Sequence, residues 1–236
     1  MSIFASKMEK EAVAKHFVDY LYELNSEDAF RTLAGIGDDG EEGDDCMYTE
    51  YMHDHIYRAI RKLGIDLQVL CGATRIVLYE PDFPFVIKFQ PFEDTNGDNY
   101  CEQERTVYEM ACEDGWEDYF CPVEKLCKFT FVAGDRTFTR DIYVMPVCDC
   151  DEDAITSKSY KHQARPGSNH HDADGDAALL ELAAYLRGHD EGVLNIFMDF
   201  LREWGVNDLH CGNWGYLDGK LVITDYAGYG SHECNF

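Results

Sequence analysis

The residues that could do metal and phosphate chemistry are gathered near the end of the sequence, in the stretch NDLHCGNWGYLDGKLVITDYAG. A hairpin turn accounts for the Asp-Gly pair in its middle, but it does not account for Asp208, Asn213 and Asp225. An aspartate after a buried strand and an asparagine at the mouth of the same hairpin can bring two oxygen ligands to one hard cation. The stretch therefore predicts a Mg²⁺ site that holds phosphates.

A lysine inside an apolar strand is the second chemical signal. Lys88 stands in the sequence VIKF, whose other members should be buried, and a charge there needs a partner because burying it alone is costly. Glu104 follows sixteen residues later on a predicted helix and could supply the negative charge. Glu102 is the alternative, because only the helix phase separates the two. A lone lysine at the edge of a sheet is the other explanation.

The spacing of apolar residues predicts the elements that position these side chains. Helical periodicity alternates with short runs rich in β-branched and aromatic residues. The expected order is helix, helix, strand, strand, strand, helix, strand, strand: residues 9–24, 48–64, two strands within 66–80, 83–89, 99–113, 120–132 and 138–147.

The pattern of apolar residues changes in the last third of the chain. Residues 149–176 are acidic and then rich in Ser, Lys, Gly and His without an apolar period, so we expect a mobile excursion there. Two helices are predicted over residues 177–189 and 191–205. The hairpin with its turn at LDGK follows these helices.

Composition limits the function. The 236 residues are 45% apolar, which is ordinary for a globular protein, but 20 basic against 46 acidic residues give a net charge of −26. Such a charge repels nucleic acid and anionic lipid, so direct nucleic-acid binding is not expected. The acidic runs are interpreted as solvated loops, with mimicry of nucleic acid as the alternative.

The cysteines and the apolar runs bear on location. Ten cysteines are scattered without paired metal-binding spacing, so reduced thiols are expected and a structural zinc site is not. No apolar run approaches the roughly 18 residues needed to span a bilayer. We therefore expect a cytoplasmic protein without a membrane partner.

In their order and spacing these motifs resemble those of the protein-kinase-like superfamily, in a small version. Lys88 in VIKF is similar to the strand lysine of V-A-I-K, and Glu104 in EQERTVYE to its helix partner. Asp208 and Asn213 in DLHCGN match the spacing D-x-x-x-x-N, and Asp225 in DYAG resembles the aspartate of D-F-G.

The resemblance implies an α+β, two-lobed, protein-kinase-like fold. It would have an N-terminal helical extension (residues 1–64), an N-lobe with a five-stranded antiparallel sheet (65–148) and a reduced, mostly helical C-lobe (149–236) with the catalytic loop and the metal-binding aspartate. Whether the first 60 residues brace the small lobe, cover the cleft or form a docking arm is left open, with the brace preferred.

The resemblance also implies that ATP is the phosphoryl donor. Lys88 and Glu104 would hold the α- and β-phosphates. Gly72, in VLCGATRIVLY, belongs to the turn that would cover the phosphates. Met145 and Val147, in VMPVC, belong to the hinge that would meet adenine through backbone groups.

The C-terminal motif would supply the catalytic and metal-binding residues. Asp208 would align or deprotonate the acceptor hydroxyl, and Asn213 and Asp225 would carry Mg²⁺. His210 stands two residues after Asp208, where many kinases have a lysine that steadies the transferred phosphoryl group, and it either does that work or satisfies a backbone carbonyl.

Two departures from the family pattern qualify the expectation. No H-R precedes Asp208, and the turn over the phosphates keeps only Gly72. No A-P-E occurs in the eleven residues after Asp225, so the helical platform on which protein kinases seat a substrate is not expected.

The expected function is an ATP- and Mg²⁺-dependent phosphotransferase acting on a hydroxyl of an unknown protein or small molecule. The alternative is a nucleotide-binding pseudokinase, or an acidic interaction protein that mimics nucleic acid and blocks a basic partner. In that case the charge of −26 is the active feature.

Overall fold

The computed structural model describes residues 2–35, 45–72, 74–92, 99–149, 173–206, 209 and 211–227. The chain is α+β and divides into two compact units. The sheet unit comprises Ser2–Glu102 and Val123–Pro146, and the hairpin unit comprises Gln103–Pro122 and Val147–Phe236.

The sheet unit contains the five-stranded antiparallel sheet that the sequence predicted. Its strand order is β1-β2-β3-β5-β4, so β5 lies between β3 and β4 and every neighbouring pair is antiparallel. The strands are β1 (Gln68–Cys71), β2 (Ile76–Tyr79), β3 (Phe85–Phe89), β4 (Glu124–Ala133) and β5 (Arg136–Pro146). β3 is therefore a central strand.

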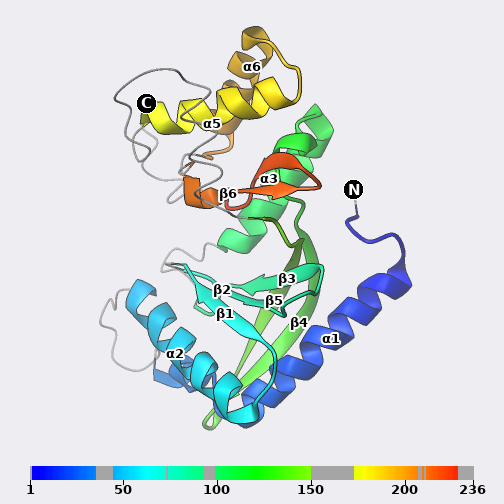
Figure 1. Cartoon of the computed structure of the whole chain (residues 1–236). Coiled ribbons are helices and arrows are strands. Elements are labelled where there is room, and N and C mark those ends of the chain that lie inside the picture. The colour runs from blue at the N-terminus through cyan, green and yellow to red at the C-terminus, as the bar shows by residue number, and fades with distance from the viewer. Residues whose placement is uncertain are drawn as a thin grey trace. The chain divides into compact units, whose positions relative to one another are not determined.

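Two long helices pack on this sheet (Figure 1), α1 (Lys7–Ser26) against β4 and α2 (Asp45–Leu63) against β1. The short 3₁₀ helix η1 (Arg31–Gly35) lies between them in the chain. α1 begins where it does because the Ser6 side chain accepts a hydrogen bond from the Glu9 backbone N–H, which caps the helix. Phe17, Leu21 and Leu24 of α1 are buried in the common core.

The strand register separates the two faces of the sheet. Ile87 and Phe89 of β3 belong to the core under the helices. Lys88 lies between them and pairs with Val77 on β2 and Tyr143 on β5. Because side chains alternate along a strand, Lys88 and its two neighbours lie on the opposite face. The N-terminal helices thus brace the face that Lys88 does not use.

The hairpin unit is built from helices and one short hairpin. α3 (Tyr100–Asp114) begins in the sheet unit and continues here. The other elements are η2 (Glu117–Tyr119), α5 (Ala173–Leu186), α6 (Glu191–Glu203), η3 (Cys211–Asn213), β6 (Trp214–Leu217) and β7 (Lys220–Ile223).

Aromatic side chains form the core of the hairpin unit. Tyr119 stacks on Phe197 of α6 at a centroid distance of 4.2 Å. The guanidinium of Arg187 lies 4.0 Å from the centre of the same tyrosine ring, a favourable cation–π arrangement. Phe120 follows Tyr119 and forms a bridge to Ile223 of β7. These contacts hold the hairpin against η2.

The segment after β5 differs in part from the sequence prediction. Regular structure was not expected over residues 149–176, but Asp149 pairs with Tyr216 through two backbone hydrogen bonds of 2.8 and 2.9 Å. α5 also begins at Ala173, a few residues earlier than its apolar pattern indicates. The rest of that segment lies outside the described residues. Within the ranges described, no helix is long and apolar enough to cross a bilayer.

Candidate functional site

Lys88 is a buried residue of a central strand. Its exposed fraction is 5%, and its neighbours Ile87 and Phe89 are fully buried. Because β3 lies between β2 and β5, the explanation of Lys88 as a lysine at a sheet edge is wrong. A charge at this depth is kept only where other groups compensate it.

Tyr143, which the sequence analysis missed, lies directly opposite Lys88 on the neighbouring strand β5. Its hydroxyl donates a hydrogen bond of 2.5 Å to the Glu102 carboxylate at the start of α3. Burial, followed by this bond and the charge of Glu102, raises the pKa of Tyr143 well above its ordinary value. A tyrosine on a buried strand needs a partner for its hydroxyl, and this was the available sequence signal.

Glu104 is fully buried in the part of α3 that belongs to the hairpin unit. The pKa of Tyr226 is raised well above its ordinary value, first by the burial of Tyr226 and then by the negative charge of Glu104. Glu104 therefore lies near the residue that follows Asp225. Lys88 belongs to the other compact unit, so its pairing with Glu104 stays a prediction.

The two predicted metal ligands lie at the same end of the β6–β7 hairpin. Trp214 pairs with Ile223 in the ladder, and the Thr224 N–H donates to the Asn213 carbonyl over 2.8 Å. This bond extends the ladder by one pair and places Asn213 opposite the residue before Asp225. Asn213 is 8% exposed and Asp225 is half-buried.

Buried aromatic residues anchor the chain on both sides of this ligand pair. The indole N–H of Trp214 donates to the Leu209 carbonyl over 2.9 Å. The hydroxyl of Tyr226 donates to the Cys121 carbonyl over 2.7 Å. Both bonds are buried, where a lost partner is costly, so the backbone around Asn213 and Asp225 is fixed from two directions.

Two predicted catalytic residues, Asp208 and His210, lie outside the described residues. Leu209 between them is described and buried. The roles of Asp208 and His210 stay predictions from the sequence motif.

The residues expected to contact ATP are divided between the units. The Gly72 N–H donates to the Arg75 carbonyl over 3.0 Å and so helps to close the turn between β1 and β2. Met145 pairs with Val86, which places it on the same face of the sheet as Lys88. Val147 follows β5 in the hairpin unit and is 44% exposed.

The oxygen ligands of Asn213 and Asp225 suit Mg²⁺, but they are few. No group of three or more His, Cys, Asp or Glu side chains that could hold a metal occurs among the residues described. Mg²⁺ is commonly held by one or two carboxylates together with substrate phosphates and water. One carboxylate and one amide oxygen fit this mode of Mg²⁺ binding.

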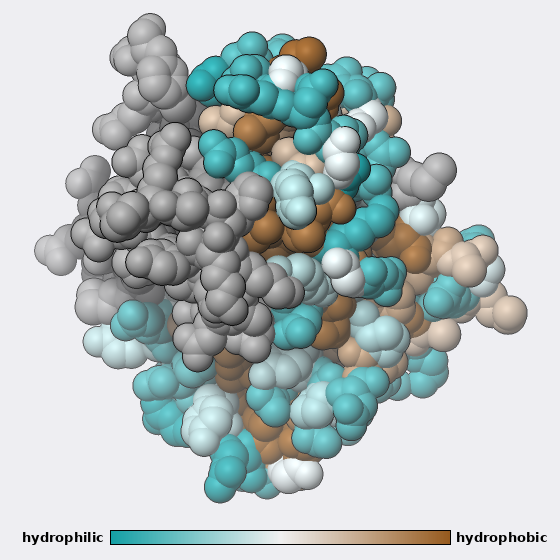
Figure 2. All heavy atoms as spheres, turned by 45° about the horizontal axis from the view of Figure 1, so that its top comes forward, coloured by the Kyte–Doolittle hydropathy of each residue, from teal (hydrophilic) through white to brown (hydrophobic). Residues whose placement is uncertain are grey.

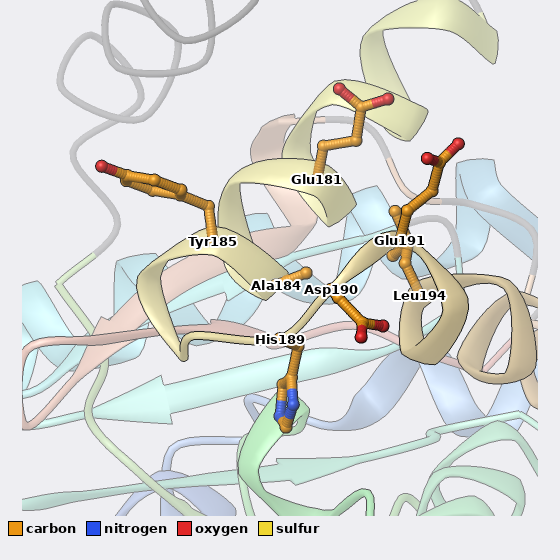
Figure 3. Close-up of a pocket in the computed structure, with 7 residues that line it drawn as sticks. All are labelled: Glu181, Ala184, Tyr185, His189, Asp190, Glu191 and Leu194. Carbon is orange, nitrogen blue, oxygen red and sulfur yellow. The ribbon is translucent and has the colours of Figure 1, made fainter.

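A pocket of about 360 Å³ lies elsewhere in the hairpin unit, where α5 meets α6 (Figure 3). It is lined by Glu181, Ala184, Tyr185, His189, Asp190, Glu191 and Leu194. Figure 3 shows the side chains of Glu181 and Glu191 pointing one way and that of His189 the opposite way. Asp190 caps α6 by accepting from the Val193 N–H. None of the predicted site residues lines this pocket.

The sequence matches no protein-family model, and no curated protein is significantly similar to it.

Proposed function

We propose that the chain is an ATP- and Mg²⁺-dependent phosphotransferase with a two-lobed, kinase-like fold, which acts on a hydroxyl of a protein or small molecule. The element order supports the proposal: three strands, a helix and two strands follow one another in the chain, and the five strands form one antiparallel sheet. The burial of Lys88 in the central strand of that sheet supports it as well.

One observation carries the proposal. The backbone bond between Thr224 and Asn213 brings two oxygen-bearing side chains, those of Asn213 and Asp225, to the same end of one hairpin. Neither residue is needed to form the turn, which is made by Asp218 and Gly219 at the other end with positive φ angles of 50° and 79°. The position of these two potential oxygen ligands supports the proposal that this end of the hairpin binds a cation.

In the proposed reaction each residue has a distinct task. Lys88 binds the α- and β-phosphates, with Glu104 as its ion-pair partner. Asp208 accepts or aligns the proton of the acceptor hydroxyl. Asn213 and Asp225 bind Mg²⁺, which when present neutralises phosphate charge. Nearly all the rate enhancement would come from positioning and charge neutralisation.

The test is thermal stabilisation by ATP with and without Mg²⁺. A ligand at 100 times its dissociation constant adds about 2.7 kcal/mol, which for a chain of this size raises Tm by roughly 5–10 °C. We expect the full shift for the wild type, and its loss for Asp225→Asn, Asn213→Ala and Lys88→Met.

Asp218→Asn is the matched control, because it changes a carboxylate at the turn of the same hairpin and asparagine tolerates positive φ. It should keep the shift. Absence of a shift in the wild type at millimolar ATP and Mg²⁺, or an equal shift in Asp225→Asn, contradicts the proposal.

The same assay separates the alternative of a nucleotide-binding pseudokinase. A catalyst should convert ATP to ADP slowly without an acceptor, and Asp208→Asn should abolish this conversion while keeping the thermal shift. A shift with no ADP from the wild type favours the pseudokinase.

The alternative of an acidic mimic rests on the net charge of −26. It requires the acidic groups to gather on one surface. On the face drawn in Figure 2, the described hydrophilic residues are interspersed with apolar ones.

A further inference from the structure

Two cysteines that the proposed phosphotransfer does not use are in contact within the hairpin unit. The Sγ atom of Cys148 lies 3.3 Å from that of Cys121. Both residues are present as thiols, although they are separated by 27 positions in the sequence. Cys121 is 1% exposed, and Cys148 is half-buried, so Cys148 is the more exposed residue of the pair.

Hydrogen bonds to backbone groups hold the chain at both cysteines. The Cys121 N–H donates to the Ile223 carbonyl over 2.8 Å, and its own carbonyl accepts from the Tyr226 hydroxyl. Next to Cys148, Asp149 exchanges two backbone bonds with Tyr216. The contact between the sulfur atoms is thus set by two anchored segments that bond to the same β6–β7 hairpin.

The pair also occupies a particular place along the chain. Cys121 precedes Pro122, the last residue before the chain passes from the hairpin unit to the sheet unit. Cys148 is the second residue after the chain returns at Val147. A covalent bond between the two would join the outgoing and the returning chain.

We infer that Cys121 and Cys148 form a redox-modification site, which a hydroperoxide converts to a reversible disulfide. The Cys148 thiolate attacks one peroxide oxygen, which gives a sulfenic acid and, with hydrogen peroxide as the oxidant, releases water. The Cys121 thiolate then attacks the Cys148 sulfur and displaces hydroxide, which leaves as a second water. Two thiols and one hydrogen peroxide thus give one disulfide and two waters.

The geometry makes the second step short. The sulfur atoms have to approach from 3.3 Å to a bond of about 2.05 Å, a movement of little more than about 1 Å shared by two side chains. The contact between the two sulfur atoms also favours the intramolecular disulfide over further oxidation of the sulfenic acid, because the resolving thiol is already in place. A dithiol reductant reverses the reaction by exchange.

The test uses the full chain, treated with one molar equivalent of hydrogen peroxide, alkylated and digested with trypsin without reduction. Trypsin leaves Cys121 on the peptide of residues 106–125, together with Cys112, and Cys148 on the peptide of residues 141–158, together with Cys150. We expect these two peptides to appear linked, two hydrogen atoms lighter than their sum, and to separate after reduction.

Matched variants assign the bond within the linked peptides. The link should persist in Cys112→Ser and Cys150→Ser and disappear in Cys148→Ser and Cys121→Ser. The inference is overturned if oxidised wild type gives no link between these peptides, or if the link survives in Cys148→Ser. Because the first measurement uses the wild type alone, it does not depend on whether every variant folds.

Discussion

Replacing Tyr143 by phenylalanine removes the donor of a partly buried hydrogen bond and keeps the ring in the sheet. The hydroxyl is 2.5 Å from the Glu102 carboxylate, and Tyr143 is 1% exposed. A hydrogen bond to a charged group contributes about 1.5–3 kcal/mol. Glu102 is only half-buried and can regain water in the variant, so we expect a loss of about 2 kcal/mol in the free energy of unfolding.

The assay is urea unfolding of the wild type and the variant at pH 7. Tyr22→Phe is the matched control, because this tyrosine is 63% exposed and its change should stay within about 0.5 kcal/mol. A double-mutant cycle with Glu102→Gln isolates the pair. The effects of Tyr143→Phe and Glu102→Gln should be clearly less than additive, because either change removes the same charge-assisted bond.

The same bond predicts a pH dependence. The pKa of Tyr143 is raised in the folded chain by burial first and then by Glu102. The contribution of the Tyr143 hydroxyl to the free energy of unfolding is therefore complete below the ordinary tyrosine pKa of about 10 and is lost as the pH rises above it. Tyr143→Phe should reduce the alkaline decline in stability. Additive effects in the cycle, or a loss no larger than that of Tyr22→Phe, would refute the assignment.

Two further changes test other anchors. Tyr226→Phe removes the buried bond to the Cys121 carbonyl and should lower the free energy of unfolding by about 1–2 kcal/mol, measured in urea. Glu124 accepts from Lys10, Ser2 and the Ile3 N–H; burial raises its pKa, but these bonds outweigh burial and lower it overall. Its stabilisation is therefore present above the ordinary carboxyl pKa of about 4.3 and lost as the pH falls through the lower folded value. Glu124→Gln should flatten this acid decline in thermal melts, and an unchanged profile would contradict the prediction.

The elements of this chain were predictable where local signals agree. The three apolar runs before residue 90 became β1, β2 and β3, and the Asp-Gly pair became the turn of the β6–β7 hairpin. The start of α1 was missed by two residues, although Ser6 and Glu9 stand in the spacing of a capping box. That signal was present in the sequence.

Long-range partners were less predictable. The bond between Tyr143 and Glu102 joins residues 41 positions apart, and neither local pattern indicates the other. The contact of Cys121 with Cys148 depends in the same way on how distant segments meet. The choice between Glu102 and Glu104 depended on helix phase, and the two residues prove to have different neighbours, Tyr143 and Tyr226. Such pairs are set by tertiary packing, which periodicity does not encode.

The indole of Trp214, which donates a hydrogen bond to the Leu209 carbonyl, is an intrinsic fluorescent probe. Trp214 is one of three tryptophans and is fully buried, next in sequence to Asn213. Any rearrangement that exposes this indole to water should shift its fluorescence emission to longer wavelength. Events at the mouth of the hairpin can therefore be followed in the unlabelled chain, with Trp116→Phe and Trp204→Phe removing the background emission.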